Sequence, residues 1–230
     1  MVVSVLQPWL RVQAVLWGAW CIAAAVDASF ARPSWIALAM GASYASLVGI
    51  LRAGRRVADI ATIVRVVLLL AALAAGQAAP ELRWWAVLVV AVFLDLVDGA
   101  LARRFGATAE GAILDMESDQ FTVLALSMVV VAQGGAPHVL VLPGLRYAFV
   151  LAMWWLSIPA HDPKPVNGDN RRGRRVCATV MIALLAATFP GAPPVVRDGA
   201  TLAASVLLAW SFSGDARHLL ARRRAAGVRA

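Results

Sequence analysis

The chain has 230 residues, of which 61% are hydrophobic and only 15% are charged, and its mean hydropathy is +0.76. Soluble domains carry about 25% charged residues, so this composition excludes an ordinary water-soluble protein and predicts an integral protein of the lipid bilayer. The net charge of +8 is almost all arginine, and we interpret it as a topology signal with no nucleic-acid partner.

Eight apolar runs follow one another along the chain, each near the roughly 20 residues that a helix needs to cross a membrane. They are residues 12–30, 34–51, 59–77, 83–102, 111–133, 139–160, 175–190 and 199–214. The sequence therefore predicts an all-α, polytopic membrane helix bundle of about eight transmembrane helices. The first run has no basic segment or cleavage site before it, so we expect a retained helix and no signal peptide.

Positive residues are distributed unequally between the two sides of this bundle. The even-numbered connections and the C-terminal end carry fifteen arginines and lysines, whereas the opposite side carries three. By the positive-inside rule, both termini and the connection between the fourth and fifth runs lie in the cytoplasm. We expect a bacterial plasma-membrane protein in this orientation.

Four aspartates lie where the fourth and fifth runs meet: Asp95, Asp98, Asp115 and Asp119. A charge at mid-membrane depth costs about 2.5–3.5 kcal/mol, so a purely structural role for all four is disfavoured. On helices, the first two share an arc of roughly 100° and the last two lie about 40° apart, so two helices can present four carboxylates to one point.

Carboxylate oxygens suit Mg²⁺ or Mn²⁺, and paired metals favour phosphoryl transfer. The residues alone thus predict a metal-dependent enzyme that acts on a phosphate ester at the cytoplasmic membrane face. A cation-coupled transporter that uses the aspartates as an ion site is the alternative. A transport path would place its acids near the midplane, whereas these four gather at one face.

The aspartates belong to a longer pattern, Asp95-x2-Asp98-Gly99-x2-Ala102-Arg103 followed by Gly111-x3-Asp115-x3-Asp119. This pattern resembles the signature of the CDP-alcohol phosphotransferases (CDP-alcohol phosphatidyltransferases). The series Asp59, Thr62, Arg65 resembles the Asn-x2-Thr-x2-Arg element of that family, with Asp59 in place of Asn. Seven residues separate Arg103 from Gly111, where the family usually has eight.

The resemblance implies a six-helix core at 57–215, two additional N-terminal transmembrane helices within 1–56, and a basic cytoplasmic tail at 216–230. It also implies an activity in phospholipid biosynthesis. A phosphatidyl or similar substituted phosphate group would pass from a CDP-linked lipid, such as CDP-diacylglycerol, to an alcohol acceptor, with release of CMP. A homodimer is a further implication, and a catalytically inactive relative is disfavoured by the complete motif.

The same resemblance assigns roles to residues. Two metal ions would be bound by Asp95, Asp98 and Asp115, with Asp119 bridging them and acting as the catalytic base. The CDP moiety would be bound by Thr62, Gly99, Ala102, Arg103 and Gly111. Candidates for binding an acceptor phosphate are Arg146, Arg172, Arg174 and Arg175. Helix packing is the alternative role for the small residues, and a topology signal is the alternative for the arginines.

Overall fold

All secondary structure in the described part of the chain is helical. The computed structural model describes residues 2–75, 81–106, 108–156 and 171–227. Its long helices are α1 (Val2–Val26), α2 (Pro33–Leu51), α3 (Val57–Ala75), α4 (Leu82–Phe105), α5 (Ala109–Ala132), α6 (Val141–Trp155), α7 (Arg171–Ala187) and α8 (Pro194–Gly227). Two short 3₁₀ helices, η1 (Ala28–Ala31) and η2 (Pro137–Leu140), precede α2 and α6. Each predicted run corresponds to one long helix, so the prediction of an all-α bundle is confirmed.

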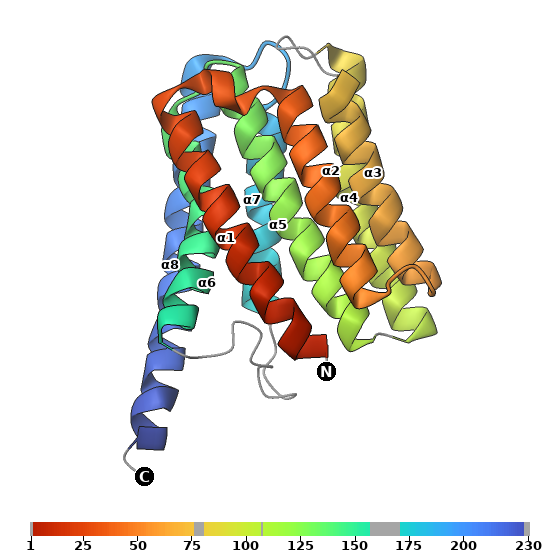
Figure 1. Ribbon diagram of the computed structural model, residues 1–230. Helices are drawn as coiled ribbons and strands as arrows, with labels where there is room; N and C mark the ends of the chain where they lie inside the picture. Colours follow the sequence, from red (N-terminus) through yellow and green to blue (C-terminus); the bar gives the residue numbers. More distant parts are fainter. Residues whose placement is uncertain (1, 76–80, 107, 157–170, 228–230) are drawn as a thin grey trace.

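Within the described residues, six helices are long and apolar enough to cross a membrane: α1, α2, α3, α4, α6 together with η2, and α8. The chain is therefore an integral membrane protein. α7 is apolar but shorter, and α5 carries acidic side chains within its first three turns. The long helices lie side by side along one direction (Figure 1).

The bounds of α1 and α8 differ most from the predicted runs. α1 begins at Val2 and ends at Val26, because Asp27 accepts a hydrogen bond from the Ser29 amide at 2.8 Å and starts η1 there. α8 begins at Pro194 and continues as a helix to Gly227, so most of the predicted tail is a helical extension. This extension projects past the ends of the other helices (Figure 1).

The start of α1, the end of α8 and the α2–α3 and α4–α5 connections lie at one end of the bundle (Figure 1). A hydrogen bond of 3.3 Å from Arg56 Nη1 to the Gly106 carbonyl joins those two connections. This common end agrees with the predicted grouping of basic connections. That it faces the cytoplasm stays a prediction.

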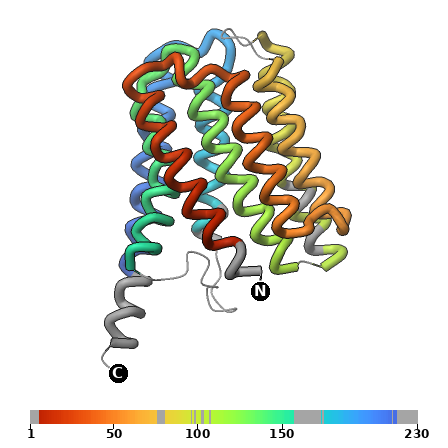
Figure 2. Tube along the Cα trace, viewed as in Figure 1, coloured from red at the N-terminus to blue at the C-terminus, as the bar shows by residue number. Residues whose placement is uncertain are grey.

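α5 is the central helix of the bundle, since it contacts α1, α2, α3, α6 and α7, and the trace of Figure 2 shows it behind α1 and α2. Every residue from Phe121 to Val131 is buried. The Phe121 ring lies edge-on to Trp17 of α1 and to Tyr44 of α2, at centroid distances of 6.3 and 5.9 Å. The Tyr44 hydroxyl and Ser118 Oγ are 3.0 Å apart. The two N-terminal helices therefore cover one side of α5.

The polar half of α3 faces into the bundle. Its buried residues recur every three or four positions, from Asp59, Thr62 and Arg65 to the apolar Val66, Leu69 and Leu73. α3 packs closely against α4 and also contacts α5. Arg65 is the last polar residue of this buried face and lies deepest in the bundle. Its side chain therefore reaches both α4 and α5, the helices that carry the aspartates.

Candidate active site

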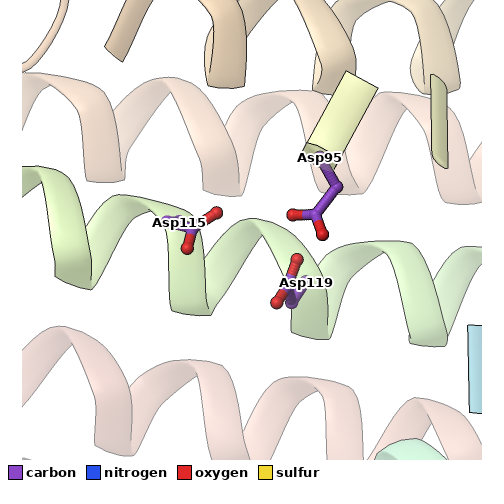
Figure 3. A group of neighbouring side chains, drawn as sticks. All are labelled: Asp95, Asp115 and Asp119. Atoms are coloured by element: carbon purple, nitrogen blue, oxygen red, sulfur yellow. The ribbon is translucent and has the colours of Figure 1, made fainter. Parts of the chain in front are cut away.

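Three of the four predicted aspartates come together in the structure (Figure 3). Asp115 and Asp119 project from successive turns of α5, as their spacing predicts, and Asp95 reaches them from α4. One carboxylate oxygen from each lies within 4.8 Å of those of the other two. The side chains remain partly accessible, at 34% for Asp95, 48% for Asp115 and 21% for Asp119. We call this set the aspartate group.

Arg65 of α3 provides a positive charge at the aspartate group, and only 1% of its side chain is exposed. Its Nη1 atom pairs with Asp95 and lies 3.1 Å from Asp119 Oδ1, while its Nη2 atom lies 3.4 Å from Asp115 Oδ1. A buried guanidinium requires paired acceptors, and the three carboxylates supply them. One side chain thus connects α3, α4 and α5.

Arg65 belongs to the family-like element Asp59, Thr62, Arg65, but it is not among the predicted site residues. The signal was present, because an arginine within an apolar run needs a partner of opposite charge. Cys177 of α7 is a second residue at the site that was not among the predicted site residues, and its Sγ atom lies 3.9 Å from Asp119 Oδ2. A fourth helix therefore borders the group.

Gly111 allows α3 and α5 to approach closely beside the aspartate group. A Cβ atom at this position would lie 3.0 Å from both Asp59 Oδ1 and Thr108 Oγ1. Thr108 caps α5 by accepting a hydrogen bond from the Gly111 amide at 3.0 Å. Helix packing thus gives one physical reason for this glycine, and its contact with a nucleotide stays a prediction.

The other predicted nucleotide residues lie on α3 and α4. Thr62 is buried, and its hydroxyl donates to the Ala58 carbonyl at 3.1 Å. Gly99 is half-buried on α4, one turn beyond Asp95. The side chains of five predicted site residues lie outside the described part of the structure: Asp98, Ala102, Arg103, Arg172 and Arg174.

The two described arginines predicted to bind an acceptor phosphate have different surroundings. Arg175 is exposed near the start of α7. Arg146 is buried in α6, and its Nη2 atom lies 2.7 Å from Oε1 of the buried Glu117. Glu117 is two residues from both Asp115 and Asp119, so it lies about 200° around α5 from each. In this structure Arg146 is the partner of Glu117.

The chemistry of the aspartate group fits a hard divalent cation. All three donors are carboxylate oxygens from side chains that solvent can reach, and Mg²⁺ and Mn²⁺ prefer oxygen ligands.

Comparison with known proteins assigns the family. The family model for CDP-alcohol phosphatidyltransferase matches residues 55–212, from just before α3 into α8. No curated protein and no solved structure matches the chain. The matched segment is more than half of the chain and contains the aspartate group, and its family consists of transferases of substituted phosphate groups. The chain belongs to the CDP-alcohol phosphatidyltransferase family.

Proposed function

We propose that the chain catalyses the metal-dependent transfer of a phosphatidyl or similar group from a CDP-linked lipid to an alcohol, with release of CMP. The observation that carries this proposal is the convergence of Asp95, Asp115 and Asp119 from two helices within a membrane bundle. Family membership favours this enzyme over a cation-coupled transporter. The proposed site of action is the cytoplasmic face of the membrane, where phospholipid would be made.

The aspartate group, together with Asp98 on α4, would hold two divalent cations. When bound, these cations would neutralise the diphosphate and make CMP a better leaving group. The described donors support this role because the three carboxylates and the one guanidinium of Arg65 leave an excess of negative charge, which bound cations would balance. The motif positions of Gly99, Ala102, Arg103, Gly111 and Thr62 support binding of the CDP moiety nearby.

The transfer requires a proton acceptor for the attacking alcohol, and we assign this task to Asp119. The alcohol oxygen would form a bond to the phosphorus of the lipid phosphate, and the bond from that phosphorus to the CMP oxygen would break. The hydroxyl proton would pass to the Asp119 carboxylate, which must lie within about 3 Å of it. Asp119 is the least exposed of the three aspartates, at 21%, and lies one turn deeper along α5 than Asp115.

A phosphate on the acceptor would need basic groups, and the exposed Arg175 with its neighbours Arg172 and Arg174 is one candidate set. Arg146 is the other candidate, and it would have to exchange its bond with Glu117 for one with the acceptor. Substituting each set of arginines and measuring KM for phosphorylated and unphosphorylated alcohols would therefore identify the acceptor class and the residues that bind it.

The test is release of CMP by purified protein supplied with CDP-diacylglycerol, Mg²⁺ or Mn²⁺ and a panel of phosphorylated and unphosphorylated alcohols. We expect CMP and a new phospholipid in equal amounts with at least one acceptor. Asp115→Asn is the matched control, since it keeps the side-chain shape and removes one anionic ligand. Absence of CMP release from folded protein with every acceptor and both metals would refute the proposed activity.

A further inference from the structure

We infer that Arg65 is an internal counter-cation of the aspartate group, which holds the carboxylates together in the metal-free protein and opposes the binding of a divalent cation. This inference rests on the proposed metal-dependent function. It concerns a residue that is neither one of the proposed metal ligands nor one of the predicted nucleotide residues.

The first observation is geometric. The guanidinium of Arg65 contacts the same three carboxylates whose oxygens lie within 4.8 Å of one another. It therefore occupies the electrostatic position that a cation ligated by these oxygens would take. Arg65 cannot lose its charge in a protein, so the site cannot remove this competitor by deprotonation.

The second observation concerns charge. Three carboxylates and one guanidinium leave an excess of two negative charges among the described side chains. Without Arg65, the three carboxylates would repel one another at short range in a partly buried place. With Arg65 retained, a divalent cation must bind beside a fixed positive charge.

The two effects predict opposite consequences of neutralising this residue. Metal-free protein should lose stability, whereas metal affinity should rise. Even in a water-like dielectric, a unit charge about 6 Å from a divalent cation weakens its binding by about tenfold. If Arg65 only held the carboxylate ligands in place, neutralising it would lower the affinity for the divalent cation.

The experiment compares full-length wild type with Arg65→Gln, using Mn²⁺ alone as the probe. Free Mn²⁺ is measured by electron paramagnetic resonance in a titration, and thermal unfolding is followed in EDTA and in saturating Mn²⁺. We expect R65Q to bind Mn²⁺ at least about tenfold more tightly than wild type. We also expect its Tm to fall in EDTA and to recover in Mn²⁺.

Arg146→Gln is the matched control, because Arg146 is a second buried arginine in an ion pair, with Glu117 and not with the aspartate group. It should lower the Tm equally in EDTA and in Mn²⁺ and leave Mn²⁺ affinity unchanged. Asp115→Asn should weaken Mn²⁺ binding, which assigns the bound ion to the aspartate group.

Equal or weaker Mn²⁺ binding by R65Q overturns the inference, while the proposed metal site stands if D115N still weakens binding. Wild type that binds no Mn²⁺, or binds it as D115N does, overturns both. If R65Q is not recovered folded even in Mn²⁺, Arg65→Met decides by the same titration. Methionine keeps an unbranched side chain of similar length and carries no charge, so tighter binding than wild type supports the inference and unchanged or weaker binding refutes it.

Discussion

The ion pair between Arg146 and Glu117 offers a sharp test of what holds α5 and α6 together. The two side chains are only 9% and 8% exposed, and their N–O distance is 2.7 Å. Removing one partner of a buried pair costs about 3–5 kcal/mol, because the other charge stays buried without its counter-ion. In proteins of this size each kcal/mol lowers the Tm by about 2–4 °C, so Glu117→Leu or Arg146→Met should lower it by roughly 6–20 °C.

The assay is thermal unfolding of purified wild type, E117L, R146M and the double variant E117L/R146M. Replacing both charges with apolar groups leaves no charge buried, so the double variant should be more stable than either single variant. Single effects that simply add in the double variant would refute the argument that the pair acts as a unit. An unchanged Tm for R146M, together with a raised KM for phosphorylated alcohols alone, would instead identify Arg146 as an acceptor-phosphate ligand.

Further predictions concern the chemistry, the topology and the assembly. Asp119→Asn should retain binding of the CDP-linked donor but lose at least about 10²-fold in turnover, which donor-binding and CMP-release assays run in parallel would separate. Activity should require Mg²⁺ or Mn²⁺ and should largely disappear in Asp115→Asn, so full turnover in excess EDTA would exclude the metal site. A reporter fused after Gln133 should be external and one after Gly168 cytoplasmic, and an external reading at Gly168 would contradict the eight-helix topology. Crosslinking in native membranes should give a dimer if the family resemblance extends to assembly, and monomer alone would argue against it.

The helices were predictable from hydropathy, but their ends were not. The segment before Arg11 contains Ser4, Gln7 and Pro8, so it falls outside an apolar run although it is part of α1. The end of α8 also lies outside the apolar stretch, because alanine, leucine and arginine have high helix propensity and continue the helix beyond it. Hydropathy identifies the part of a helix that can contact lipid, whereas the helix propensity of the flanking residues continues the helix beyond that part.

The site was predictable where its geometry is local. The i, i+4 spacing of Asp115 and Asp119 places both on one face of α5 without any knowledge of the other helices. The contacts of Arg65 join it to residues 30, 50 and 54 positions away, so they depend on how three helices pack. The pairing of Arg146 with Glu117 was missed for the same reason, although each is a charge that an apolar environment requires to be paired.

The position of α5 at the centre of the bundle has a consequence for how the protein is made. α5 is not among the six helices apolar enough to enter a bilayer by composition alone, and it carries the acids on which the proposed chemistry depends. Its neighbours α1 and α2 are synthesised first, and they present Trp17 and Tyr44 to Phe121 and Ser118. We therefore expect the N-terminal helices, which lie outside the family match, to give the acidic helix a surface to pack against within the membrane.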